Sequence, residues 1–120
     1  MINGGWIKLN RNILNWEWYH DSNTKNLFFH CLLRANYEDQ KYRGEVIPKG
    51  SFVSSYRHLA EETGLSYQQI RTALEHLKAT HEITQTSYSK YTVFTVVRWE
   101  EYQCEQHEET QSINSQSTVK

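Results

Sequence analysis

The sequence predicts a single α+β domain in which three helices precede a C-terminal β-hairpin. Two amphipathic helical segments meet at a turn on Gly64, and two segments rich in β-branched and aromatic residues follow them. With 120 residues, the chain is long enough to bury a hydrophobic core without disulfides or a metal ion. We therefore assign residues 1–103 to one domain and expect residues 104–120 to form an acidic, polar, disordered tail.

A short strand and a helical turn are expected ahead of the first long helix. Residues 6–9 alternate apolar and polar side chains, as a strand does, and a helical turn is expected at residues 11–14. The first long helix is expected at residues 23–36, because Asp21 and Ser22 offer a cap and apolar residues then recur at helical spacing.

Four aromatic residues lie in or beside this N-terminal extension: Trp6, Trp16, Trp18 and Tyr19. We interpret them as core residues. The alternative is that some of them form a self-association surface, since exposed aromatic side chains mark interfaces.

The middle of the chain predicts a loop, a strand and a second helix. Residues 37–48 are polar and contain the single proline, which favours a surface loop. Residues 50–54 follow as a short strand, and residues 56–63 form an amphipathic helix. Gly64 ends this helix, because glycine readily adopts the left-handed conformation that follows many helices.

The third helix is expected to begin at Tyr67, because Ser66 and Gln69 match a capping box. Its buried positions recur at helical spacing: Ile70, Ala73, Leu74 and Leu77. This register leaves five polar side chains on or near the outer face: Gln68, Arg71, Thr72, Glu75 and His76.

Residues 83–87 and 91–97 are expected to form a β-hairpin whose turn is Tyr88-Ser89-Lys90. A helix-turn-helix followed by a hairpin is the order of a winged helix-turn-helix. In that arrangement the last helix lies in the DNA major groove and the hairpin contacts the flanking backbone.

Seven residues are the candidate contacts with double-stranded DNA: Arg57, Tyr67, Gln68, Arg71, Thr72, Tyr88 and Lys90. Gln68 and Thr72 are placed for base edges, since an amide can pair bidentately with adenine. Arg71 suits guanine or a phosphate, whereas Arg57 and Lys90 suit phosphates. The two tyrosines suit stacking or hydrogen bonds to the backbone. The alternative for each residue is a solvated helix or turn.

Charge divides along the chain, although the net charge is only −1. Residues 1–99 contain 12 Lys and Arg against 9 Asp and Glu, whereas residues 100–120 contain 1 against 5. The folded part is thus mildly basic. Affinity for DNA should then depend on where the cations cluster and on dimerisation.

Several functional classes are not expected from this sequence. No apolar run approaches the roughly 20 residues of a membrane span and no signal peptide is present, so we expect a cytoplasmic protein without membrane contact. Cys31 and Cys104 lie in different settings, which disfavours a disulfide. Cys104 and His107 have the spacing of two zinc ligands, but the sequence offers no second pair of Cys or His ligands near them. No metal or other cofactor is therefore expected. No catalytic motif is present, and we expect a protein that is not an enzyme.

The sequence also resembles the N-terminal winged-helix domain of phage replisome organisers and DnaD-like primosomal proteins. The resemblance covers about residues 5–103, in five blocks that occur in the same order: 5–14, 47–54, 59–66, 69–74, and 90–93 continuing to Trp99 and Tyr102. His81 departs from the pattern, because such sequences commonly have glycine after the third helix. The hairpin turn also carries little positive charge.

The resemblance implies a homo-oligomeric protein that binds DNA at a replication origin or assembles a primosome with a helicase or its loader. A second domain usually makes the loader contacts in such proteins, so loader activity is not expected here. Two alternatives remain open: a winged-helix transcriptional regulator, and an oligomerisation or interaction module that does not bind DNA. Glu75 places a negative charge on the outer face of the third helix, and this charge is the reason that the interaction module stays an alternative to DNA binding.

Overall fold

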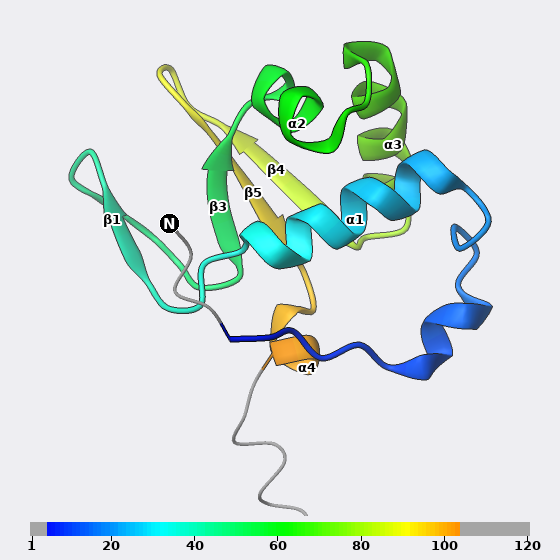
Figure 1. Ribbon diagram of the computed structural model, residues 1–120. Helices are drawn as coiled ribbons and strands as arrows, with labels where there is room; N and C mark the ends of the chain where they lie inside the picture. Colours follow the sequence, from blue (N-terminus) through cyan, green and yellow to red (C-terminus); the bar gives the residue numbers. More distant parts are fainter. Residues whose placement is uncertain (1–4, 104–120) are drawn as a thin grey trace, which may run out of the picture.

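The computed structural model describes residues 5–103 (Figure 1). The tail predicted at residues 104–120 lies outside the described residues, as do Cys104 and His107. The elements follow in this order: η1 (Arg11–Asn15), α1 (Ser22–Arg34), β1 (Gln40–Tyr42), β2 (Glu45–Ile47), β3 (Ser51–Ser54), α2 (Tyr56–Thr63), α3 (Tyr67–Ala79), β4 (Ile83–Ser87), β5 (Thr92–Val96) and α4 (Trp99–Gln103). The predicted α+β class is confirmed.

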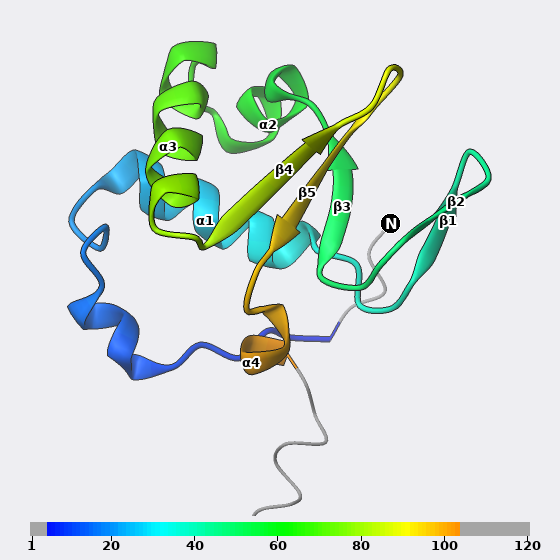
Figure 2. The same ribbon diagram turned by 180° about the vertical axis from the view of Figure 1, so that it is seen from behind.

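Two antiparallel sheets carry the β-structure of the described chain. One is the β1–β2 hairpin, and the other has three strands in the order β3-β5-β4. Helices α1, α2 and α3 lie on one side of the three-stranded sheet, as the two opposite views show (Figures 1 and 2). Phe52 faces Phe94 across β3 and β5 at 5.7 Å between ring centroids, and both rings are buried with Leu74 and Leu77 of α3. Apolar burial on this face holds the helices to the sheet.

The α2-turn-α3 unit agrees with its prediction. Helix α2 has the predicted bounds, and Gly64 caps it with a φ of 82°. The Ser66 and Gln69 capping box is present, and all four predicted apolar positions of α3 are buried. His81 takes the left-handed conformation, with a φ of 65°, at the position where the sequence departs from glycine. The turn geometry of this unit is therefore encoded locally.

Helix α1 begins at Ser22 after the Asp21 cap and ends at Arg34, two residues before the predicted end. The reason is tertiary pairing by Asn36. Its N–H donates to the carbonyl of Ser51 (3.0 Å) and its carbonyl accepts from the N–H of Gly50 (2.8 Å). Because Asn36 is bound to the start of β3, its backbone groups cannot continue the helix.

The strand predicted at residues 6–9 is wrong. These residues have no strand partner within the described chain, and Trp6 is 83% exposed. Alternation of apolar and polar residues marks a strand only when another strand supplies hydrogen bonds. The helical turn predicted after it is present as η1.

The loop predicted at residues 37–48 is also wrong in part, because it contains the β1–β2 hairpin. Arg43 and Gly44 form its turn with φ angles of 53° and 82°. Two consecutive residues with positive φ match the twist of the flanking strands and permit a tight two-residue connection. The sequence did not predict this turn, because its first position holds an arginine where Asn or Asp is usual.

Two of the four N-terminal aromatic residues tie the extension to the domain. Trp16 Nε1 donates to Glu82 (3.0 Å), and Trp18 Nε1 donates to Thr80 (3.0 Å). Both indole rings pack against the core, as predicted. Trp6 is exposed instead, and its prediction as a core residue is wrong.

Candidate nucleic-acid interface

The outer face of α3 presents the central predicted residues. Tyr67, Gln68, Arg71 and Thr72 are all exposed, and Glu75 is exposed one turn further along. The side-chain amide of Gln68 donates to the hydroxyl of Thr72 (3.3 Å), so the two predicted base-reading residues lie side by side. This face has hydrogen-bonding groups that a ligand can reach.

His76 was expected near the outer face, but it is partly buried against α1. Its ring stacks on Trp18 with centroids 4.2 Å apart, and its Nδ1 is hydrogen-bonded to the hydroxyl of Thr24 (2.9 Å). Asp21 lies 3.3 Å from the same nitrogen. His76 therefore joins α3 to α1 and to the N-terminal extension, and it is not part of the interface.

Arg71 has no hydrogen bond or ion pair with any residue in the 5–103 range, so its guanidinium can meet an incoming anion. Lys78 follows it by seven residues, which is about two helical turns and therefore nearly the same face. Its ammonium donates to Gln85 of β4 (2.8 Å), which also accepts from the Tyr56 hydroxyl (3.0 Å). The prediction missed Lys78, although its spacing from Arg71 was a usable signal.

Arg57 lies at the start of α2 with its side chain 84% exposed. Its Nε lies 3.7 Å from a carboxylate oxygen of Glu61, one turn further along. An exposed pair of this kind is worth little in water, so a phosphate can displace the Glu61 carboxylate.

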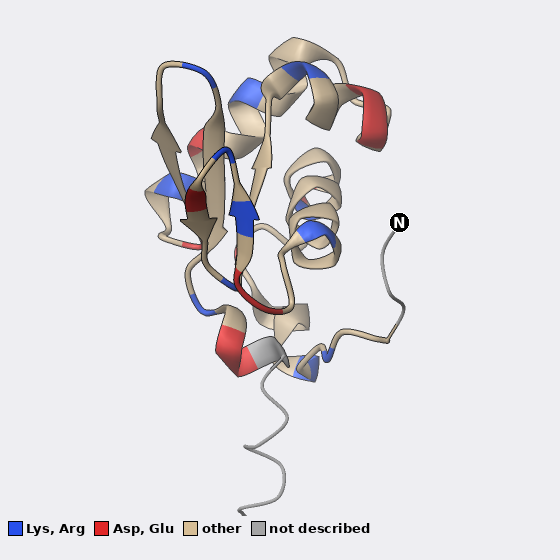
Figure 3. Cartoon of the chain, turned by 90° about the vertical axis from the view of Figure 1, so that its left-hand side faces the viewer, with Lys and Arg blue, Asp and Glu red and all other residues tan. Residues whose placement is uncertain are grey.

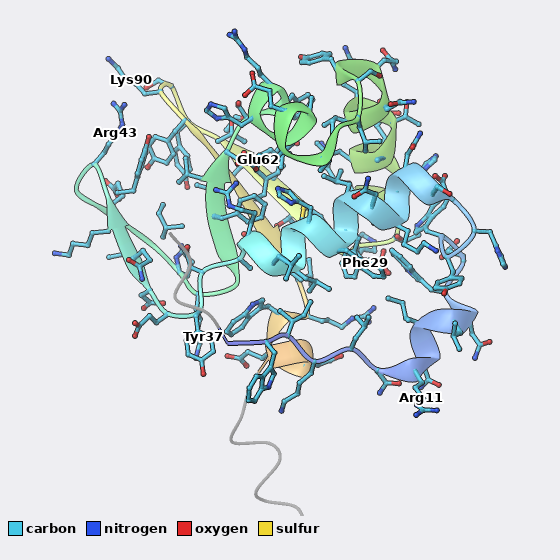
Figure 4. All side chains as sticks on the ribbon, viewed as in Figure 1. Arg11, Phe29, Tyr37, Arg43, Glu62 and Lys90 are labelled. Carbon is cyan, nitrogen blue, oxygen red and sulfur yellow. The ribbon has the colours of Figure 1, made fainter. Side chains whose placement is uncertain are left out.

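Tyr88 and Lys90 lie in the turn of the β4–β5 hairpin, as predicted, and both are exposed. The hairpin closes where the Tyr88 N–H donates to the Tyr91 carbonyl (2.7 Å). The Tyr88 ring stacks on that of Tyr91 with centroids 4.9 Å apart. Figure 4 shows Lys90 at the tip, pointing away from the domain.

The predicted residues gather at one end of the molecule. In both Figures 1 and 2 the β4–β5 turn, α2 and the N-terminal half of α3 lie at the same end, and α4 lies at the other. Figure 3 shows basic residues at the tips of both hairpins and acidic residues on α4. Within the described residues, however, no hydrogen bond, ion pair or ring contact joins the α3 side chains to Tyr88 or Lys90. A ligand that contacts both the outer face of α3 and the β4–β5 turn must therefore extend from one to the other.

Glu62 of α2 contacts two side chains of α1, His30 and Arg34. Its Oε1 accepts from His30 Nε2 (2.8 Å) and from Arg34 Nη1 (2.7 Å). Partial burial acts to raise the pKa of Glu62, but the His30 hydrogen bond and the Arg34 charge outweigh it and lower the pKa. The carboxylate thus stays charged and is matched by its neighbours.

Three further observations concern the Cys31 thiol, metal-ligating side chains and helix hydrophobicity. Burial raises the pKa of the Cys31 thiol to about 12, which keeps the group protonated and unreactive at neutral pH. In the part of the chain that the structure describes, no group of three His, Cys, Asp or Glu side chains is arranged to hold a metal ion. Over the same residues, no helix is long and apolar enough to cross a membrane.

The exposed outer face of α3, the β4–β5 turn and the cations around them thus make up the candidate interface. Comparison with known proteins adds no assignment, because no family model, curated protein or solved structure matches the chain.

Proposed function

We propose that this chain binds duplex DNA through a winged helix-turn-helix and acts in replication initiation of a phage or mobile element. The single observation that carries the DNA-binding proposal is the exposed outer face of α3, on which Gln68, Arg71 and Thr72 stand without burial. The order α2, turn, α3 and β4–β5 hairpin supports the winged-helix interpretation.

In the proposed complex, α3 enters the major groove with its N-terminal half. Gln68 exchanges its weak hydrogen bond with Thr72 (3.3 Å) for the edge of a base. Arg71 binds guanine or a phosphate, and Lys78 and Arg57 neutralise backbone phosphates on either side. Lys90 places a further cation on the flanking backbone.

The replication role is supported by the sequence resemblance, and two of the blocks that carry the resemblance contact each other in the fold. Gly50, from the 47–54 block, lies against Trp99, from the last block. A Cβ atom built on Gly50 would stand 3.0 Å from the Trp99 Cβ. The last block thus contacts the start of β3, which is the part of the domain that precedes α2. Loader activity is not part of this proposal.

The test compares Arg71→Ala with Arg11→Ala in fluorescence anisotropy on a labelled duplex. Both variants lose one cation, but Arg11 lies on η1, away from both hairpin tips (Figure 4). We expect Arg71→Ala to weaken binding, and Arg11→Ala to bind like the wild type. If Arg71 holds a phosphate, its loss also lowers the slope of log affinity against log salt by about 1, with sequence preference unchanged.

A change in the preferred sequence would instead identify Arg71 as a base reader, with a cost of about 1–3 kcal/mol at that position. Equal weakening by the two variants would mean that the affinity comes from overall charge, and the assignment of α3 as the binding element would fail. Circular dichroism of both variants checks that each remains folded.

A further inference from the structure

A groove of about 820 Å³ lies beside the candidate duplex interface. It is bounded by the β1–β2 hairpin, the β4–β5 turn, the C-terminal end of α1 and the N-terminal part of α2. The lining residues that matter here are Arg34, Tyr42, His58, Tyr88, Lys90 and Tyr91. The groove is therefore aromatic and basic, and it lies toward the β1–β2 hairpin and away from α3.

We propose that this groove binds a strand of single-stranded nucleic acid. The site is distinct from the outer face of α3 and shares only the β4–β5 turn with the proposed duplex interface. A variant can therefore lose single-strand binding and keep duplex binding, or the reverse.

Three tyrosine rings form one wall of the groove. Tyr42 meets Tyr91 edge-on with centroids 5.0 Å apart, and Tyr88 stacks on Tyr91 at 4.9 Å. Tyr88 is 53% exposed, which leaves ring surface for an incoming base. Aromatic side chains bind unpaired bases by stacking, and they do so without sequence preference because every base has a π-face.

Cations stand at both rims of the groove. Figure 4 shows Arg43 and Lys90 at the tips of the two neighbouring hairpins. Arg43 lies over the Tyr42 ring at 5.4 Å, and neither cation has an ion pair within residues 5–103. A strand whose bases stack on the tyrosines would run its phosphates between these two tips.

The one carboxylate in the groove does not oppose this binding. Glu62 accepts hydrogen bonds from Arg34 (2.7 Å) and from His30 (2.8 Å), so its charge is already matched. His58 and the hydroxyl groups at the start of α2 add hydrogen-bonding groups to the groove. Arg43 and Lys90 supply the cations at the rims, while Glu45 lies opposite Tyr42 on the same face of the β1–β2 hairpin and places one negative charge beside Tyr91.

An unpaired strand fits these features better than a duplex does. Bases within a duplex are already stacked on their neighbours, so their faces cannot reach the tyrosine rings. The groove also lies between two hairpins that project in the same direction (Figures 1 and 2). Stacking on Tyr88 and phosphate contacts at the tips both require a strand whose bases are free.

The test is anisotropy of a labelled oligo(dT) of about twelve nucleotides, with oligo(U) of the same length as a second probe. We expect the full chain to bind, and Tyr88→Ala to weaken binding by about 5- to 150-fold, which is the usual effect of losing one stacked ring. Tyr88→Phe keeps the ring and should retain the affinity. Tighter binding of oligo(U) than of oligo(dT) supports the same groove with RNA as its strand.

Arg43→Ala and Lys41→Ala form a matched pair on the β1–β2 hairpin. Lys41 precedes Tyr42 in β1, so its side chain points to the opposite face of the strand. We expect Arg43→Ala to weaken oligo(dT) binding and Lys41→Ala to leave it unchanged. Equal effects of the two variants would overturn the proposal, as would wild-type protein that binds duplex DNA but no oligo(dT).

The duplex measurement separates this inference from the proposed function. Arg43→Ala should bind duplex DNA like the wild type, because the β1–β2 hairpin is not part of the α3 interface. Loss of oligo(dT) binding alone therefore locates the strand in the groove. If Arg43→Ala instead loses duplex and single-strand binding together, the groove is not a separate site and the inference is wrong.

Discussion

At the scale of single residues, Glu62 is a carboxylate whose pKa is lowered by the groups around it. His30 and Arg34 both donate to it from α1, so the ionised form is favoured in the folded protein. The same three side chains join α1 to α2 on the side of the molecule where the groove lies. Their charge state should therefore be visible in the stability of the protein.

We predict that Glu62→Gln reduces the loss of stability in acid. Burial opposes the shift, but the His30 hydrogen bond and the Arg34 charge leave the pKa of Glu62 below its usual value of 4.5. A carboxylate with a lowered folded pKa stabilises the protein above the unfolded pKa, and this contribution is lost as pH falls through the folded pKa. Urea unfolding between about pH 5 and about pH 3 measures the difference.

Glu61→Gln is the control, because Glu61 lies on the same helix with an exposed partner. Its pH dependence should match that of the wild type, whereas that of Glu62→Gln should be flatter. If all three proteins lose stability in parallel, the native charge cluster has no role in acid stability.

The sequence predicted which residues of α3 are exposed because helical periodicity fixes the faces of an isolated helix. The exposed positions Gln68, Arg71 and Thr72 follow directly from the buried stripe. The inward turn of His76 could not be predicted, because it depends on Trp18 and Thr24, which are distant in sequence. Tyr42 was missed for the same reason, since its contact with Tyr91 exists only after folding.

At the scale of elements, α2 and α3 were predictable because their ends carry their own stop and start signals. The Gly64 cap and the Ser66–Gln69 capping box act within one turn of the chain. The β1–β2 hairpin was not predictable, because Arg43 takes a positive φ that sequence patterns assign to Asn, Asp or Gly. Residues 6–9 show the opposite error, since a strand-like pattern there pairs with no other strand of residues 5–103.

We predict that Gly50→Ala destabilises the protein more than Gly64→Ala does. Both glycines have a φ above 80°, which costs a substituted alanine about 1–2 kcal/mol. A Cβ at position 50 would also stand 3.0 Å from the Cβ and 3.1 Å from the Cγ of the buried Trp99, whereas position 64 has no atom within 4 Å. Overpacking of this kind adds about 1–3 kcal/mol.

Urea unfolding of the two variants and the wild type gives the comparison directly. Equal losses of stability at the two positions would mean that Trp99 moves aside without cost. The contact between the start of β3 and α4 would then contribute little to holding the C-terminal helix in place.

At the scale of the whole molecule, the charges are separated in a way that the net charge of −1 conceals. Cations without ion pairs, Arg71, Arg43 and Lys90, lie on α3 and at the two hairpin tips, while Glu100 and Glu101 lie on α4 at the other end (Figure 3). A polyanion should therefore bind at the end that carries these unpaired cations, whereas at the other end Glu100 and Glu101 are partly offset by Lys49 (3.5 Å) and Arg98 (3.9 Å). The sequence predicted the excess of positive charge in residues 1–99, but only the fold shows where it gathers.

The most direct test of duplex binding is the anisotropy of a labelled random-sequence duplex titrated with the full chain at about 50 mM and about 200 mM salt. With about four phosphates neutralised, affinity should fall about 100-fold between the two conditions. Absence of binding at both salt concentrations, or an affinity that does not change with salt, would contradict the account.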